Sequence, residues 1–178
     1  MDLTQPPVKG TQRITLLALL TAIALTIFMV EAQIPVPFPI PGIKLGLANI
    51  VTLYAVFVLG PADALLILAG RVFLGAVFSG QMMTLLYSLG GGLLAWLVMA
   101  LLSKPLTPRQ LWLCSPVAAL FHNLGQLLVA AAVLKSWTVL AYLPYLILAG
   151  ILTGLFTGLG AQALIRHLDK LNLSPKKD

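Results

Sequence analysis

Five stretches without a charged side chain constrain this chain more than any other feature. They cover residues 14–30, 45–62, 72–103, 110–134 and 136–165. Each is long enough, or nearly so, for a helix of about 20 residues to cross a hydrocarbon core of about 30 Å. Because 60% of the 178 residues are hydrophobic and only 9% are charged, the chain has too little polar surface for a water-soluble fold. The sequence therefore predicts an all-α integral membrane protein of the cell membrane.

Proline, glycine and polar residues divide these stretches into six segments. From Ile34 to Gly42, proline stands at every second position, which removes amide donors and favours an extended, apolar loop. Gly60-Pro61, the residues 79–81 and the polar stretch 103–109 mark further breaks. We expect six transmembrane helices, at about residues 13–31, 44–59, 62–79, 82–102, 111–134 and 142–167.

The basic residues indicate how this bundle is oriented, because cytoplasmic loops carry an excess of Lys and Arg. With six helices and both termini in the cytoplasm, eight of the 11 basic residues are cytoplasmic, Lys44 and Lys135 are outside, and Arg71 lies within a span. Five helices would put the basic C-terminal tail outside and spoil this asymmetry. We expect a cytoplasmic N-terminal segment at 1–12, one six-helix domain at 13–168 with an outer loop at 31–43, and a cytoplasmic tail at 169–178.

Several function classes are disfavoured by what the sequence lacks. It contains no G-x-x-x-x-G-K-[ST] nucleotide loop, and its five acidic residues include no aspartate-rich diphosphate–magnesium motif. The single cysteine and the two histidines offer no metal-ligand spacing. The net charge of +6 flanks hydrophobic segments instead of forming a basic patch for nucleic acid. We expect no enzyme activity and no cofactor.

Three polar residues in the predicted helices two and three are candidate substrate contacts. Arg71 lies deep in a span, where a charge costs about 2.5 to 3.5 kcal/mol and persists when it faces a partner, a cavity or a ligand. An internal ion pair with Asp63 or Glu31 is the structural alternative. Lys44 either contacts substrate or extends to the membrane interface. Asn49 carries a buried amide that needs hydrogen-bond partners.

Helix five contains the densest polar cluster, which is His122, Asn123 and Gln126. His122 and Gln126 are four residues apart and share a helix face. Either they bind substrate, or they form hydrogen bonds between helices. Small residues at every fourth position let helix backbones approach closely. Gly150, Gly154 and Gly158 favour internal packing, whereas the face with Ala18 and Ala22 is a candidate docking face for another membrane protein.

Three sequence runs resemble a known membrane family. They are IPVPFPIPGIKLGLANIVTL at residues 34–53, LLYSLGGGLL at 85–94 and HNLGQL at 122–127. They are similar to the family of heptaprenyl diphosphate synthase component I, also called the Gx transporter family, which in turn resembles the substrate-binding S-components of energy-coupling factor (ECF) importers. The resemblance implies six helices, cytoplasmic termini and a pocket near the outer face beneath the loop between helices one and two. It also implies that Ala18 and Ala22 meet a membrane coupling subunit, while separate ATPase subunits supply energy.

The sequence thus predicts the substrate-binding membrane subunit of an ECF-type importer, with a small amphipathic or anionic substrate such as an isoprenoid or quinone precursor. Lys44 and Arg71 would offset an anionic group, and Asn49, His122, Asn123 and Gln126 would hydrogen-bond it. On the loop, Val36, Phe38 and Ile40 would cover an apolar portion. The alternative is a non-catalytic membrane component that partners a soluble prenyl diphosphate synthase.

Overall fold

The computed structural model describes residues 10–34 and 44–171, and these residues fold entirely into helices and connecting turns. Six α-helices and two short 3-10 helices make up the described chain. They are α1 (Thr11–Glu31), α2 (Asn49–Val58), α3 (Pro61–Ser79), α4 (Met82–Leu102), η1 (Pro108–Gln110), α5 (Leu111–Leu134), η2 (Trp137–Tyr142) and α6 (Leu143–Lys170). The predicted all-helical class is confirmed for this part of the chain.

Five of these helices are long and apolar enough to cross a membrane. They are α1, α3, α4, the helix formed by η1 with α5, and the helix formed by η2 with α6. Large apolar side chains cover their outer surfaces, among them Ile14, Leu148 and Phe156, which are 69%, 63% and 71% exposed. Such a continuous apolar surface is compatible with lipid but not with water. The chain is therefore a membrane-embedded helical protein.

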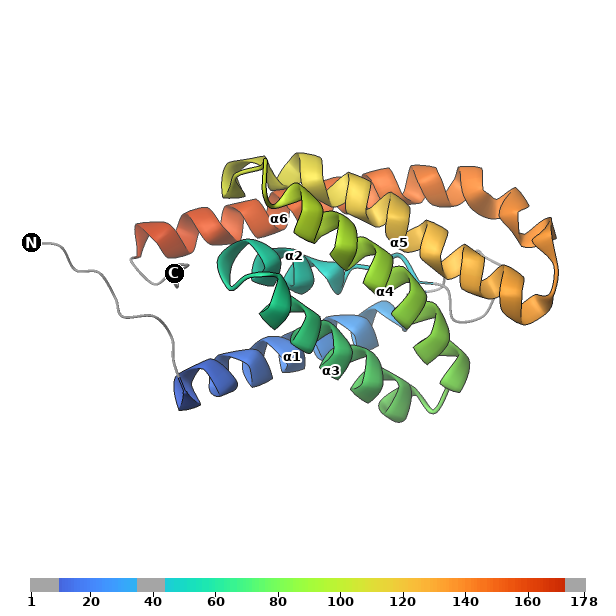
Figure 1. Ribbon diagram of the computed structural model, residues 1–178, viewed down its shortest axis with the longest axis horizontal. Helices are drawn as coiled ribbons and strands as arrows, with labels where there is room; N and C mark the ends of the chain where they lie inside the picture. The colour runs from blue at the N-terminus through green and yellow to red at the C-terminus, as the bar shows by residue number, and fades with distance from the viewer. Residues whose placement is uncertain (1–9, 35–43, 172–178) are drawn as a thin grey trace, which may run out of the picture.

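The remaining α-helix, α2, is short and lies at the centre of the bundle (Figure 1). It packs against α1 and α3 on one side and against α4 and α6 on the other. Only Ile50 among its 10 residues is not buried. At 1.5 Å per residue it is about 15 Å long, half the thickness of the hydrocarbon core. Its burial on nearly every side explains why its sequence is almost entirely apolar.

The predicted start of this helix at Lys44 was wrong, because α2 begins five residues later, at Asn49. Gly46 has a φ of 85°, a left-handed conformation that interrupts helical geometry and that glycine adopts without strain. The backbone of residues 44–47 also forms hydrogen bonds with side chains of other helices, as described below. We call residues 44–48 the pre-helix segment.

Other helix boundaries agree closely with the sequence pattern. Helices α4 and α5 begin and end where predicted. Pro61 occupies the first turn of α3, where its missing N–H costs nothing, and Gly80 ends that helix in a left-handed conformation. The loop residues Val36, Phe38 and Ile40 lie outside the described residues.

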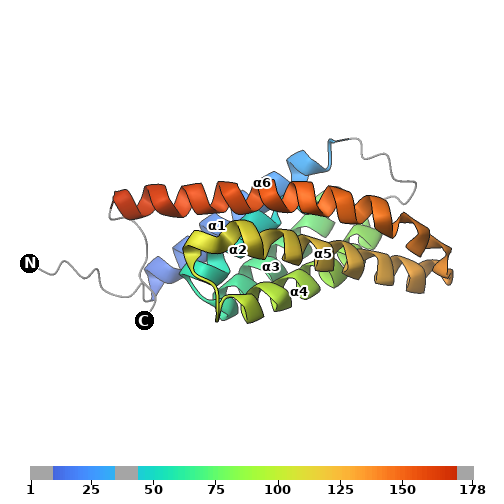
Figure 2. The same cartoon turned by 90° about the horizontal axis from the view of Figure 1, so that it is seen from above.

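Helices α5 and α6 lie side by side and pack closely, and the C-terminal turns of α6 extend beyond the start of α5 (Figure 2). A Cβ atom added at Gly158 would lie 2.7 Å from the carbonyl oxygen of Leu111, and one at Gly150 would lie 2.8 Å from the Asn123 amide. The predicted internal packing role of these glycines is confirmed.

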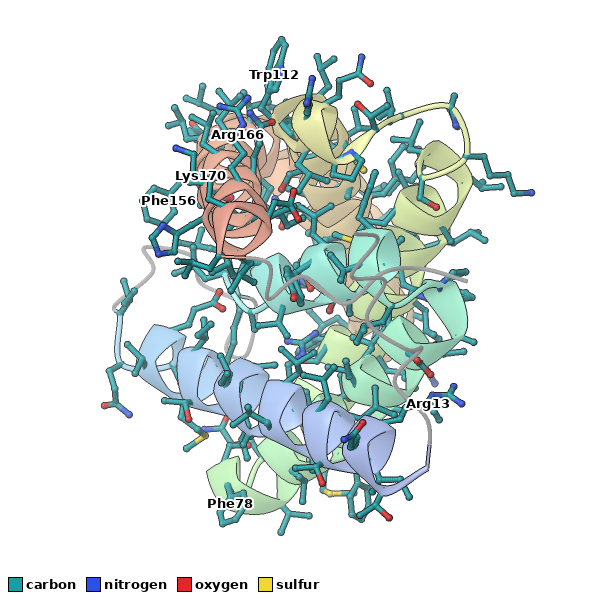
Figure 3. The ribbon with its side chains drawn as sticks, turned by 90° about the vertical axis from the view of Figure 1, so that its left-hand side faces the viewer. Arg13, Phe78, Trp112, Phe156, Arg166 and Lys170 are labelled. Carbon is teal, nitrogen blue, oxygen red and sulfur yellow. The ribbon has the colours of Figure 1, made fainter. Side chains whose placement is uncertain are left out.

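The first residue of α1 and the last residue of α6 lie at the same end of the bundle (Figure 1). Arg13, Arg166 and Lys170 are at this end, on α1 and α6 (Figure 3). Arg13 forms an ion pair with Asp63 in the first turn of α3, where a carboxylate is favourable to the helix dipole. Asp63 is therefore the partner of Arg13, and the predicted alternative of an Arg71–Asp63 pair is wrong.

Candidate functional site

The candidate site is a buried polar cluster where the pre-helix segment meets α1, α3, α4 and α5. Five of the predicted residues come together there: Lys44, Asn49, Arg71, His122 and Gln126. Direct hydrogen bonds join Arg71 to Asn49, Gln126 to His122 and Gln126 to the Lys44 backbone. The cluster contains residues from parts of the sequence that are more than 70 positions apart, so only the tertiary fold assembles it.

Glu31 holds the pre-helix segment in place. The Gly46 N–H donates to its Oε1 at 2.6 Å, and the Leu47 N–H donates to its Oε2 at 3.0 Å. Both carboxylate oxygens thus bind amides that precede the first turn of α2, where a helix presents free N–H groups and attracts negative charge. Glu31 is 2% exposed. From the sequence, Glu31 was predicted only as a possible ion partner of Arg71, although a carboxylate at the end of an apolar helix signals a need for buried donors.

Gln126 binds the same segment from the opposite side. Its Oε1 accepts from the Lys44 N–H at 3.0 Å, and its Nε2 donates to the Lys44 carbonyl at 3.1 Å. This pairing fixes the orientation of the Gln126 amide, so its second N–H faces His122 Nε2. His122 Nε2 must therefore accept, and the imidazole proton lies on Nδ1. Within the described residues, that Nδ1 is buried and forms no hydrogen bond of normal geometry, although the backbone of Gly91 lies beside the ring.

Two glycines allow this close arrangement. A Cβ atom at Gly46 would lie 2.9 Å from both Asn49 Nδ2 and His122 Cδ2. One at Gly91 would lie 2.8 Å from Gln126 Cγ and 3.0 Å from His122 Cε1. The backbones of the pre-helix segment and of α4 therefore touch the polar side chains of α5 directly, and a larger residue at either position would displace them.

Two cations face one aromatic ring in the cluster. The Lys44 ammonium lies 3.2 Å from the centroid of the Phe28 ring, and the Arg71 guanidinium carbon lies 5.9 Å from it. Both positions are favourable for cation–π attraction.

Arg71 is 2% exposed and uses few of its five donors. Its Nη2 donates to Asn49 Oδ1 at 3.4 Å, a long hydrogen bond, and its Nε has no partner within the described residues. Both Glu31 oxygens are already bound by amides, and no ion pair joins Glu31 to Arg71 in residues 10–34 and 44–171. The cluster thus combines two cations with one carboxylate and leaves buried donors without acceptors.

The other predicted residues lie apart from this cluster. Asn123 faces α6, where its Nδ2 donates to the Leu146 carbonyl at 2.7 Å, while its Oδ1 has no partner in the described part of the chain. Ala18 and Ala22 are exposed on the outer face of α1. The predicted interhelical hydrogen bonding of helix five is thus present at Asn123.

Comparison with known proteins is consistent with the resemblance noted from the sequence runs. The family described as heptaprenyl diphosphate synthase component I matches residues 20–164. The chain belongs to this family. The match begins within α1 and extends into α6, so it includes every residue of the polar cluster. No curated protein and no solved structure matches the chain.

The cluster could accommodate an acceptor-rich group. Its side chains supply N–H donors and positive charge, and the described residues of this family member contain no group of three His, Cys, Asp or Glu side chains that could hold a metal ion. An acceptor-rich group brought to Arg71, Lys44 and His122 would satisfy donors that the protein leaves free.

Proposed function

We propose that this protein is the substrate-binding membrane subunit of an ECF-type importer in the prokaryotic cell membrane. The observation that carries the proposal is the buried polar cluster, in which Arg71 Nε and His122 Nδ1 have no acceptor among the described residues. Unpaired buried donors cost about 1 to 3 kcal/mol each in protein interiors. A ligand that accepts from them would recover that free energy.

The proposed topology has six spans with both termini in the cytoplasm. Five helices are long enough to cross the core, and α2 would complete a sixth crossing together with the pre-helix segment. The start of α1 and the end of α6 lie on the same side of the bundle, together with Arg13, Arg166 and Lys170, as expected for the cytoplasmic side. The polar cluster lies near the opposite end of α1, which supports a site toward the outer face.

In the proposed site, Arg71 and Lys44 attract an anionic group of a small amphipathic substrate, and Asn49, His122 and Gln126 hydrogen-bond it. The proline-rich loop would cover the apolar part of the substrate through Val36, Phe38 and Ile40. The pre-helix segment connects that loop to the cluster directly, since Glu31 and Gln126 both bind its backbone.

Ala18 and Ala22 are the proposed contact with a membrane coupling subunit. Both are exposed on α1, and their small side chains would let a partner helix approach the backbone. ATPase subunits attached to the coupling subunit would supply the energy that this chain has no nucleotide loop to provide.

Affinity purification from native membranes in mild detergent tests the importer role. We expect a membrane coupling protein and ATPase subunits to co-purify, and we expect Ala18→Leu with Ala22→Leu to release them by blocking helix approach. Ala163→Leu, a matched change at an exposed alanine of α6, should leave the complex intact. Retention of the partners by the α1 double variant would contradict the proposed contact.

The family description favours a second candidate, which is a non-catalytic membrane component of a heptaprenyl diphosphate synthase. In that case the same purification would recover a soluble prenyl diphosphate synthase in place of the ATPases. Recovery of the synthase alone would refute the importer role.

A further inference from the structure

The polar cluster has an unequal charge balance that specifies which ligands it accepts. Lys44 and Arg71 contribute two positive charges, and Glu31 is the one carboxylate close to them in the part of the chain that the structure describes. The other acidic residues of α3 and α6 lie elsewhere: Asp63 binds Arg13, and Asp169 is exposed near the end of α6. The buried cluster therefore carries one positive charge in excess.

His122 adds no charge to this balance. Because the Lys44 backbone fixes the Gln126 amide, and that amide donates to His122 Nε2, the ring is the neutral tautomer with its proton on Nδ1. An imidazolium would place two donors against each other at Nε2. The groups left free in the cluster, Arg71 Nε and His122 Nδ1, are then both donors.

We propose that the site selects a monocarboxylate, a ligand with one negative charge and two acceptor oxygens. One carboxylate neutralises the excess charge, and its oxygens satisfy donors that are otherwise unpaired. This inference rests on the proposed function, because it names the substrate class of the same site.

A phosphate or diphosphate fits the same cluster poorly. A phosphate monoester carries about 1.5 to 2 negative charges at neutral pH, and a diphosphate carries more. Either would leave excess negative charge in a buried region, where unpaired charge is costly. A neutral amide would leave the positive charge unbalanced and would bring its own donors toward Arg71 and His122. Charge balance thus distinguishes the three head groups.

Equilibrium dialysis of the full chain in lipid nanodiscs, with empty nanodiscs subtracted, tests this selection. The probes are geranate, octanoate and phenylacetate, each with its primary amide, together with geranyl diphosphate. We expect at least one acid to bind saturably and at least about tenfold more tightly than its amide, equivalent to about 1.4 kcal/mol, and geranate to bind more tightly than geranyl diphosphate. Absence of saturable binding by all three acids, equal binding of acid and amide, or tighter binding of the diphosphate would each overturn the proposal.

Variants of the cluster test whether it causes the preference for the acid over the amide. Arg71→Gln should reduce the ratio of acid to amide affinity to within about twofold, whereas Arg71→Lys, which keeps the charge, should retain part of it. Arg166→Gln is the matched control at an exposed arginine and should change nothing. Lys44→Gln, at a half-buried position, provides a second test if Arg71→Gln does not fold. An unchanged ratio in the folded variants would overturn the assignment.

The outcome is separable from the importer test. A preference for the acid in a protein that co-purifies with a synthase would refute transport and keep the site chemistry. Importer subunits bound to a protein that prefers the diphosphate would keep transport and refute the ligand class.

Discussion

Replacement of Glu31 by alanine should destabilise the protein more than any surface change. The carboxylate accepts hydrogen bonds from the backbone amides of Gly46 and Leu47, and its side chain is 2% exposed. Alanine leaves both amides without an acceptor in a region that water reaches poorly. It also leaves the positive charges of Lys44 and Arg71 without their nearby carboxylate.

The magnitude follows from the number of amides affected. A buried donor left unsatisfied costs about 1 to 3 kcal/mol, so two amides lower the free energy of unfolding by about 2 to 6 kcal/mol. We expect about 4 kcal/mol for Glu31→Ala. Glu31→Gln retains one acceptor oxygen but loses the charge, so its expected cost is about 2 kcal/mol.

Unfolding by SDS in mixed micelles, followed by tryptophan fluorescence, measures these differences. Asp169→Asn is the matched control, because it removes an exposed carboxylate and should change the free energy of unfolding by less than about 0.5 kcal/mol. In the Glu31→Gln background, Lys44→Gln should recover part of the loss, because it removes one of the two unbalanced cations. A loss below about 1 kcal/mol for Glu31→Ala would refute the argument that this carboxylate holds the pre-helix segment.

Two further predictions concern Gly46 in the cluster and Asn123, which lies apart from it. Gly46→Ala should lower the free energy of unfolding by about 1 to 3 kcal/mol in the same assay, because the added Cβ would lie 2.9 Å from Asn49 and His122 and the φ of 85° is strained for alanine; wild-type stability would contradict this packing. Asn123→Ala should cost about 1 kcal/mol of stability by removing the hydrogen bond to the Leu146 carbonyl, with ligand affinity within about twofold of wild type; a larger loss of affinity would place Asn123 in the binding site.

The sequence predicted the helices of this protein well because lipid simplifies the problem. A helix in a hydrocarbon core must satisfy its own backbone and present apolar side chains, so charge-free length and proline or glycine breaks mark its limits. Helices α4 and α5 accordingly begin and end where the pattern placed them. The glycine repeat of α6 predicted its packing for the same reason, since close backbone approach needs small residues.

The pattern failed at the start of α2, where the backbone finds partners outside its own helix. The apolar residues after Lys44 predict one continuous helix. Instead, Glu31 accepts hydrogen bonds from the Gly46 and Leu47 amides. Gln126 accepts from the Lys44 N–H and donates to the Lys44 carbonyl. No local pattern reveals a hydrogen bond to a side chain about 80 positions away. Gly46 was the local signal, because a glycine at a predicted helix start is compatible with a left-handed turn.

The sequence by itself determined that the chain lies in lipid, that its fold is helical, and which polar residues need partners within the membrane. Only the tertiary structure decided which partners they found. Asp63 binds Arg13 instead of Arg71, Glu31 binds two backbone amides, and Asn123 faces α6. The physical reason is that apolar burial does not depend on the orientation of particular atoms. Each hydrogen bond and ion pair, in contrast, depends on the positions of two atoms that the chain brings together only on folding.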